Sequence, residues 1–412
     1  MGIFLKNIGQ LITVAGGGPR SGNRMRDLGI IESGAVLTDG ENIAAVGTMD
    51  AVERLVSGSV EVIDAHDMVV MPGFIDPHTH LVYGGSREEE FALRLDGVDY
   101  AEISRRGGGI KSTVRATRKT AEEELFATGY ERLNRLLTYG TTTVEAKSGY
   151  GLNEEAELKL LRVIQRLNDS HSLDVVSTFL GAHAIPEESS SQEFTKLIVD
   201  RMLPQVSRLA LAEFCDVFCE RGFFSYEESK EILGEAKKLG FKLKIHADEL
   251  SSSGGSELAG ELSAVSADHL VYPSKRGLNS MRQAGVVAVL LPGTILMLGL
   301  RDRPPTNEFV RLGIPVALAS DLNPGTCTIE SMQIIVGLAS LILGLSPEEA
   351  LVASTINAAY AVGRGDLVGS LEPGKMADIL VFDAPNFKYL VYHFTTNYLT
   401  HVVKRGRLIF SK

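Results

Sequence analysis

The sequence predicts an α/β fold, a TIM (β/α)8 barrel with a small β-sandwich domain formed by the N- and C-terminal segments. Eight short apolar runs alternate with helical patterns between residues 69 and 365, as expected for buried parallel strands and their crossover helices. β-rich segments with turn signals occupy both ends of the chain. Histidines and carboxylates follow the apolar runs, at positions that form the carboxyl-terminal face of such a barrel.

The two ends of the chain show the same β-rich pattern. Residues 1–68 contain short apolar runs, two of which flank Asp39-Gly40, a hairpin signal. The triple glycine Gly16–Gly18 interrupts this segment; a phosphate-binding loop is disfavoured there because no Lys-Ser/Thr pair and no helix follow it. Residues 366–412 return to short strands. We therefore expect 1–68 and 366–412 to form one discontinuous domain, with 69–365 as the barrel domain.

The barrel strands are predicted from apolar runs of strand length that are separated by helical patterns. The helix predicted over Asn153–Asn168 has the clearest pattern, because Asn153 can cap it and acidic residues fill its first turn. Ser346 begins a capping box before a further helix. The eight predicted strands are Val69–Pro77, Thr141–Ala146, Val175–Ala182, Phe214–Cys219, Phe241–Ile245, Ala264–Ala267, Val286–Leu291 and Pro315–Ala319.

Composition and charge limit the possible partners. The formal net charge is −11 and no block of Lys or Arg occurs, which disfavours nucleic acid and anionic membranes but allows a small anionic substrate. The three cysteines form no disulfide framework, and the N-terminus lacks the pattern of a secretory signal. No apolar run reaches membrane-spanning length. We expect a soluble cytoplasmic protein.

His78 and His80 follow the first apolar run. In an extended strand, residues two apart point to the same face, so both imidazoles aim into one space. Neutral imidazole is the commonest protein ligand for a metal such as zinc. A chance polar pair at a strand end is the alternative, and other ligands elsewhere in the chain decide between the two.

Those ligands occur at the ends of the other predicted strands. Five of the nine histidines fall at strand ends, whereas structural histidines would be scattered. Because inward side chains at strand ends converge on the barrel axis, these residues should lie together. The strand-end residues are His78, His80, Glu145, His183, Glu220, His246, Asp268, His269 and Asp321.

The ligand set that fits best consists of His78, His80, His246 and Asp321, three nitrogens and one oxygen with room for a water. The absence of a thiolate set favours zinc, although iron or manganese would accept the same ligands. A two-metal site would need a bridging group such as a modified lysine on strand four. That strand ends in Glu220 instead, so we predict one metal ion.

Other polar residues are candidates for proton transfer and substrate binding. Glu249 could move a proton from the attacking water to a leaving nitrogen; an exposed loop acid or a partner for His246 is the alternative. His269 could orient the nucleophile or polarise a carbonyl; a fifth ligand or a hydrogen-bonded core histidine is the alternative. Arg87 could bind a carboxylate, or be a surface ion-pair partner. Tyr150 could offer its hydroxyl, and Gly107–Gly109 has the composition of a mobile loop or lid.

The chain resembles the amidohydrolase superfamily through Pro-Gly-Phe-Ile-Asp-Pro-His-Thr-His at 72–80, His246, His269 and Asp321. Within it, the chain is similar to the family that hydrolyses the imidazolone ring of 4-imidazolone-5-propanoate to N-formimidoyl-L-glutamate. The similar stretches are Phe74–Arg87, Gly107–Thr117, Val144–Leu152, Thr178–Pro186, Ala212–Glu220, Lys244–Leu250, Ser266–Leu270, Asp321–Gly325 and Thr355–Ala359.

The resemblance implies one zinc or iron ion per subunit on the four ligands, catalytic roles for Glu249 and His269, and a homodimer. Leu322 and Thr294–Leu300 depart from the family pattern, which affects the expected pocket shape but none of the ligands. The substrate contacts implied by the resemblance are Arg87, Tyr100, Tyr150, His183, Glu249, Asn323, Gly325 and Thr326.

Two other functions are compatible with parts of the sequence. Another cyclic-amidine hydrolase or a deaminase of the cytosine or guanine type would use the same metal set, but it has no need of an arginine beside the site. A non-catalytic scaffold would have lost ligands, and none is missing here.

Overall fold

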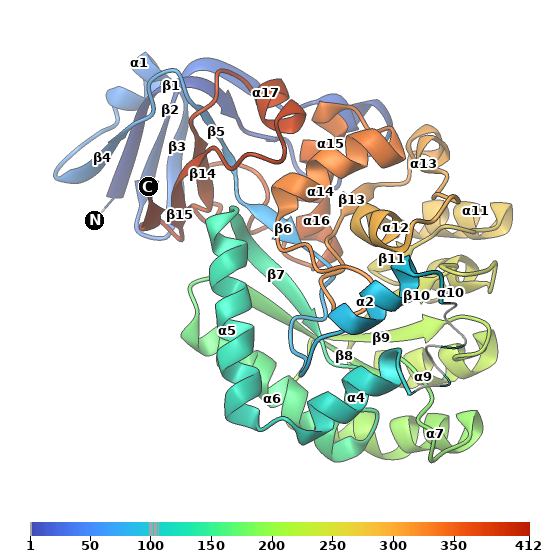
Figure 1. Cartoon of the computed structure of the whole chain (residues 1–412). Helices are drawn as coiled ribbons and strands as arrows, with labels where there is room; N and C mark the ends of the chain where they lie inside the picture. The colour runs from blue at the N-terminus through green and yellow to red at the C-terminus, as the bar shows by residue number, and fades with distance from the viewer. Residues whose placement is uncertain (1, 99–101, 103–104, 106) are drawn as a thin grey trace.

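The computed structural model describes residues 2–98, 102, 105 and 107–412, and these residues form two eight-stranded sheets (Figure 1). One sheet is an all-parallel barrel surrounded by helices, and the other is a mixed sheet built from both ends of the chain. The predicted fold class is confirmed. The lobe predicted as a sandwich is one continuously hydrogen-bonded sheet, on which the N- and C-terminal segments lie side by side.

The barrel strands follow one another in chain order around the sheet. Their bounds agree closely with the predicted runs, except at the first strand. The strands are β6 (Phe74–Asp76), β7 (Thr141–Lys147), β8 (Asp174–Ala182), β9 (Phe214–Cys219), β10 (Lys242–Ala247), β11 (Ser266–His269), β12 (Val287–Leu290) and β13 (Val316–Leu318).

The barrel closes beyond the ends of its first and last strands. Thr79 forms a parallel bridge with Leu322. The His80 N–H donates to the Leu322 carbonyl (2.8 Å), and the Asp321 N–H donates to the His78 carbonyl (3.1 Å). The backbone that closes the barrel therefore also brings two predicted metal ligands of strand one beside the predicted ligand of strand eight.

The mixed sheet has the order β16-β15-β14-β5-β1-β2-β3, with β4 paired to β1. A buried apolar cluster lies against it, separate from the larger core of the barrel. Its strands are β1 (Gly2–Ile12), β2 (Ile30–Asp39), β3 (Asn42–Thr48), β4 (Val60–Asp64), β5 (Val69–Pro72), β14 (Ile379–Phe382), β15 (Leu399–Lys404) and β16 (Arg407–Ser411).

The predicted first barrel strand, Val69–Pro77, is wrong as a single element. Its first half, β5, pairs with β1 and β14 of the mixed sheet, and only β6 belongs to the barrel. The chain crosses between the sheets at Gly73, where a Cβ would lie 2.1 Å from Thr142 Oγ1. Only glycine fits there, because β7 passes so close to the backbone.

Helices cover the outside of the barrel, and the predicted caps are present. Asn153 accepts the Ala156 N–H at 2.8 Å, and Ser346 forms a capping box with Glu349. The helices are η1 (Gly22–Arg26), α1 (Met49–Glu53), α2 (Glu88–Leu95), α4 (Ile110–Lys119), α5 (Glu122–Thr138), α6 (Glu154–Ser170), α7 (Ser191–Leu197), η2 (Ile198–Met202), α8 (Leu203–Arg208), α9 (Tyr226–Lys238), α10 (Gly255–Leu262), α11 (Lys275–Ala284), α12 (Pro292–Leu298), α13 (Thr306–Leu312), α14 (Met332–Leu338), η3 (Ala339–Leu343), α15 (Pro347–Ala353), α16 (Ile356–Ala361) and α17 (Phe387–Tyr392).

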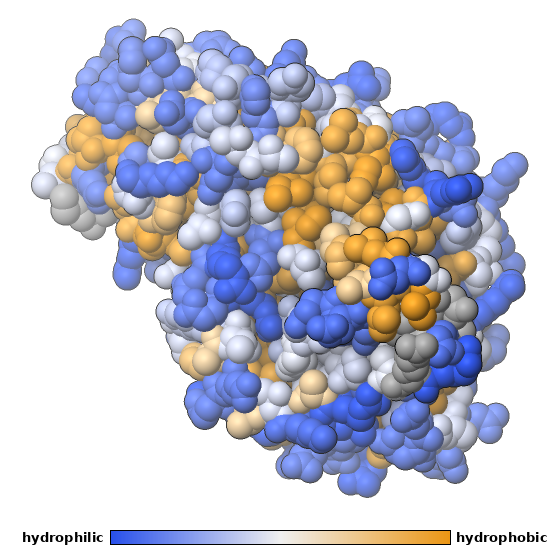
Figure 2. Space-filling view, in the orientation of Figure 1, coloured by the Kyte–Doolittle hydropathy of each residue, from blue (hydrophilic) through white to orange (hydrophobic). Residues whose placement is uncertain are grey.

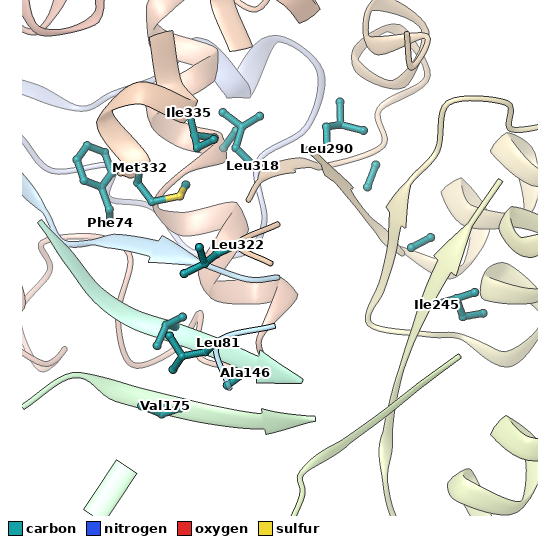
Figure 3. Close-up of a cluster of buried hydrophobic side chains, with 14 of the residues drawn as sticks. Phe74, Leu81, Ala146, Val175, Ile245, Leu290, Leu318, Leu322, Met332 and Ile335 are labelled. Atoms are coloured by element: carbon teal, nitrogen blue, oxygen red, sulfur yellow. The ribbon is translucent and has the colours of Figure 1, made fainter. Parts of the chain in front are cut away.

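Apolar side chains fill the space between the barrel strands and these helices (Figure 3). Phe74, Leu318 and Met332 are buried there and come from the first strand, the last strand and a covering helix. The three cysteines are buried free thiols. Among the described residues, no helix is long and apolar enough to cross a membrane.

His171, between α6 and β8, gives a testable dependence of stability on pH. Its Nδ1 accepts the Leu173 N–H (3.1 Å), and its Nε2 lies 3.1 Å from Asn134 Oδ1, an arrangement that suits the neutral ring. Burial lowers its pKa from 6.5 to about 4. Between these pH values the unfolded chain binds the proton and the folded chain does not, so the free energy of unfolding falls as the pH falls.

We expect His171→Gln to remove this contribution. The stability advantage of the wild type over the variant, measured from urea midpoints, should shrink as the pH is lowered from 7 to 4.5. The comparison cancels the contributions of the other buried histidines, which both proteins share. An advantage that stays constant over this range would contradict the prediction.

Candidate metal centre and active site

The four predicted metal ligands lie together at the carboxyl-terminal mouth of the barrel. His78 and His80 follow β6, His246 is in β10, and Asp321 follows β13. Asp321 Oδ1 lies 3.6 Å from His78 Nε2 and 3.7 Å from His80 Nε2. The ring centroids of His78 and His246 are 4.5 Å apart. Asp321 has φ 55°, a left-handed conformation that is uncommon for residues other than glycine.

The donor atoms of this group fit a metal ion. Nitrogen atoms of His78, His80 and His246 lie within 4.8 Å of one another, and all three rings are buried. In the described part of the chain, His78 Nε2 and His246 Nε2 have no hydrogen-bond partner, although such buried nitrogens normally have one. A tetrahedral ion with bonds of about 2.1 Å separates its ligand atoms by about 3.4 Å, close to the distances around Asp321 Oδ1.

Two buried aspartates face the far sides of the ligand rings. Asp268 Oδ2 lies 2.6 Å from His78 Nδ1, and Asp216 Oδ2 lies 3.0 Å from His246 Nδ1. Burial lowers the pKa of His78 well below its usual value, so its ring is neutral. A carboxylate at Nδ1 favours the tautomer with the proton there and leaves Nε2 free for a metal.

A buried lysine connects these aspartates below the ligands. Lys147 Nζ in β7 donates to Glu145 Oε1 (2.7 Å) and Asp216 Oδ2 (2.8 Å), and it lies 3.9 Å from Asp268 Oδ2. Sequence reasoning missed Asp216. The available signal was an acidic residue in the middle of the apolar strand Phe214–Cys219, where only an inward-facing partner could compensate its charge.

The carboxylate of Asp321 is held by hydroxyl groups on its other oxygen. Thr294 Oγ1 donates to Oδ2 at 2.5 Å, and Thr326 Oγ1 donates to it at 3.4 Å. These bonds leave Oδ1 facing His78 and His80. Thr294 belongs to the stretch that departs from the family pattern, and here it orients a predicted ligand.

Glu249 lies in the loop that follows β10. Its Oε1 is 3.4 Å from His269 Nδ1, and burial, aided by the charge of Asp321, raises its pKa to about 8. Glu220 holds this loop by accepting the Leu250 N–H at 2.9 Å and the Ser251 N–H at 3.2 Å. These hydrogen bonds to the loop account for a carboxylate at the end of β9, so Glu220 need not be the ligand of a second metal ion.

His269 lies at the end of β11 with φ 76°. Its ring centroid is 5.4 Å from that of His78. One nitrogen of each ring and one oxygen of Asp321 all lie within 4.8 Å of one another. The position suits a group that contacts the nucleophile, and it also suits the alternative of a fifth ligand.

Tyr150 and His183 form an aromatic wall beside the ligands. His183 stacks on His80 with the ring centroids 4.8 Å apart, and its Nδ1 lies 3.1 Å from the Gly149 carbonyl oxygen. The Tyr150 ring is 5.4 Å from His80. Glu157 holds the loop by accepting the N–H groups of Gly149 (2.9 Å), Gly151 (2.7 Å) and Leu152 (2.9 Å). This function of Glu157 was not predicted.

Arg87 reaches the mouth from the loop before α2. It forms the ion pair that was considered as an alternative, with Glu90 at 2.7 Å, yet its side chain is only 13% exposed. Asn323 uses its side-chain oxygen to accept the N–H groups of Gly325 (2.8 Å) and Thr326 (2.7 Å), so it shapes the loop after β13. Tyr100, the remaining predicted contact, lies outside the described residues.

Comparisons with known proteins show which sequences the chain is similar to. A family model of the amidohydrolase family matches residues 69–409. An imidazolonepropionase from Alkaliphilus oremlandii is 48% identical, with 100% of this chain and 98% of the relative covered. Imidazolonepropionases from Shouchella clausii (49% identical, 99% and 92% covered) and Geobacillus kaustophilus (47%, 99% and 97%) are similarly close.

Solved structures share the fold at low sequence identity. Guanine deaminase from E. coli has a TM-score of 0.75 at 16% identity, with 100% of this chain and 99% of that chain covered. An atrazine chlorohydrolase variant from Arthrobacter aurescens, complexed with zinc and atraton, has a TM-score of 0.75 at 18% identity, with 99% and 95% covered. At this identity the similarity concerns the fold alone.

Proposed function

The chain belongs to the amidohydrolase family, and we propose that it hydrolyses the imidazolone ring of 4-imidazolone-5-propanoate to N-formimidoyl-L-glutamate, a step of histidine degradation. The observation that carries this proposal is the buried three-histidine, one-carboxylate cluster with an arginine at its rim. Full-length relatives named imidazolonepropionase support the choice of substrate.

We propose His78, His80, His246 and Asp321 as the ligands of one zinc or iron ion. Their unpartnered nitrogens, the single carboxylate and the absence of a thiol among them fit either metal. The ion would supply a water of lowered pKa and would polarise the ring carbonyl.

Glu249 would move the proton of the reaction. Water adds to the ring carbonyl carbon, the bond from that carbon to the ring nitrogen breaks, and this nitrogen must gain a proton. A carboxylate takes the proton from the attacking water and returns it to the leaving nitrogen. Burial places the Glu249 pKa at about 8, so the group exchanges protons in the neutral range. His269, 3.4 Å away, would orient the same water.

Arg87, Tyr150 and His183 would position the substrate. The guanidinium suits the propionate, because a planar fork of N–H donors matches a carboxylate. The aromatic wall of Tyr150 and His183 suits the flat ring. The loop residues Asn323, Gly325 and Thr326 would line the side next to Asp321.

A deaminase of the cytosine or guanine type remains the second candidate, because it would use the same cluster of metal-binding histidines and aspartate. It would release ammonia and would have no use for Arg87.

The predicted homodimer stays a prediction. Figure 2 shows apolar surface over the region of α12 and α14, and Leu296 of α12 and Leu341 of η3 are among the exposed large apolar residues.

The reaction is tested by following the ultraviolet absorbance of freshly prepared imidazolone propionate together with ammonia. We expect rapid loss of absorbance without ammonia, abolished by a chelator and restored by zinc or ferrous iron. No reaction by the metal-loaded protein would contradict the substrate, and stoichiometric ammonia with a neutral ring would favour the deaminase.

A further inference from the structure

Arg87 uses only one edge of its guanidinium in the ion pair with Glu90. Arg87 Nε (2.9 Å) and Nη2 (2.7 Å) both donate to Glu90 Oε2. A guanidinium has five N–H donors on two usable edges. No described residue accepts a hydrogen bond from the second edge, formed by Nη1 and the remaining N–H of Nη2, so this edge is left for another carboxylate.

Glu90 is itself held from a second side. The Gly109 N–H lies 3.1 Å from both of its oxygens, and Ser112 Oγ donates to Oε1 at 3.0 Å. One carboxylate thus connects Arg87, at the start of α2, to the start of α4. The Glu90 side chain is only 15% exposed, so these charge-assisted bonds are stronger than those of a surface pair.

The free edge of Arg87 faces the loop after β13. A Cβ on Gly325 would lie 2.1 Å from Arg87 Nη1, so this glycine provides the space that the guanidinium occupies. The free edge therefore lies beside the loop that follows Asp321, at the mouth of the barrel.

We propose that Glu90 is a positioning residue that fixes Arg87 so that its free edge binds the carboxylate of the substrate. This rests on the proposed function, in which the substrate carries a propionate. Glu90 does not touch the substrate. It fixes the rotamer of a long, flexible side chain and so reduces the conformational entropy that binding would otherwise cost.

A simple charge argument predicts the opposite effect. If Glu90 only neutralised Arg87, its removal would strengthen the attraction for an anionic substrate. The two mechanisms therefore differ in the sign of the change in affinity, which makes them separable by measurement.

The test uses Glu90→Gln, because an amide replaces one acceptor oxygen with a donor and cannot accept from Arg87, Gly109 and Ser112 together. Glu89→Gln is the matched control. It removes the same charge from the same helix, and Glu89 is exposed, with no hydrogen bond or ion pair to another described residue.

Binding is measured by calorimetry on the metal-loaded protein with two stable probes, imidazole-4-propionate and its neutral analogue 4-propylimidazole. We expect Glu90→Gln to weaken binding of the carboxylate probe about tenfold and to change binding of the neutral probe less than about twofold. In turnover, KM for imidazolone propionate should rise about tenfold, with kcat within about threefold of the wild type. Glu89→Gln should match the wild type in every measurement.

Gly325→Ala provides an independent perturbation, since its methyl group would push the guanidinium from the opposite side. It should produce the same selective loss for the carboxylate probe. Unchanged or tighter binding of imidazole-4-propionate by Glu90→Gln would overturn the proposal. A wild type that does not prefer the carboxylate probe would instead contradict the proposed substrate, so the two failures are distinguishable.

Discussion

Glu249→Gln is expected to lower kcat by about 10³-fold while the protein stays folded and keeps its metal. The amide has nearly the shape of the carboxyl group but cannot accept and return a proton. Glu249 is also absent from the four-residue ligand set, so its replacement leaves every ligand in place. The measurement is steady-state turnover of imidazolone propionate, with metal content determined in the same samples.

Two further measurements make this result specific. Binding of imidazole-4-propionate should be within about threefold of the wild type, because Glu249 is assigned to proton transfer and not to the propionate. Glu249→Asp, which keeps the acid but shortens its reach, should lie between the wild type and the amide. A Glu249→Gln variant with at least a tenth of wild-type kcat would assign proton transfer to another group, with His269 the nearest candidate.

Lys147→Met is expected to have the largest effect on stability, about 3–5 kcal/mol. Lys147 is buried without solvent contact between Glu145 and Asp216. Burial alone would lower its pKa, but the charges of these two residues outweigh burial and raise it. Methionine fills a similar volume without the charge, so Glu145 and Asp216 would lose the buried lysine that lies between them.

The same substitution should weaken metal binding about 10- to 100-fold, because Asp216 and Asp268 would lose the charge that keeps them aimed at the ligand histidines. Thermal unfolding with chelator and with metal, together with competition against a metal indicator, separates the two effects. Lys242→Met, in strand β10 of the same barrel but with a half-exposed side chain, is the control and should change neither quantity appreciably. A Lys147→Met protein as stable as this control would refute the proposed role.

Much of the architecture follows from local sequence. The apolar runs of the barrel match the observed strands to within a residue or two, since buried parallel strands leave an uninterrupted apolar signature. The Asn153 and Ser346 caps were predictable because their hydrogen bonds join residues three apart. The prediction failed at Val69–Pro77, where an apolar run gave no sign that Gly73 divides it between two sheets.

The sequence by itself determined which residues stand at strand ends, and therefore that His78, His80, His246 and Asp321 would converge. Strand periodicity and barrel closure are sufficient for that conclusion. Only the tertiary structure decided which ion pairs hold the site in place. Lys147 pairs with Asp216 below the predicted ligands, and Glu90 pairs with Arg87 at the rim. The first pairing joins residues 69 positions apart across the barrel interior. The second joins residues within one helical turn. Its role in positioning Arg87 depends on Gly109, which contacts Glu90, and on Gly325, which lies beside Arg87; both come from distant loops. Sequence patterns record the local backbone, whereas the partner of a buried charge is set by which strands and loops meet in space.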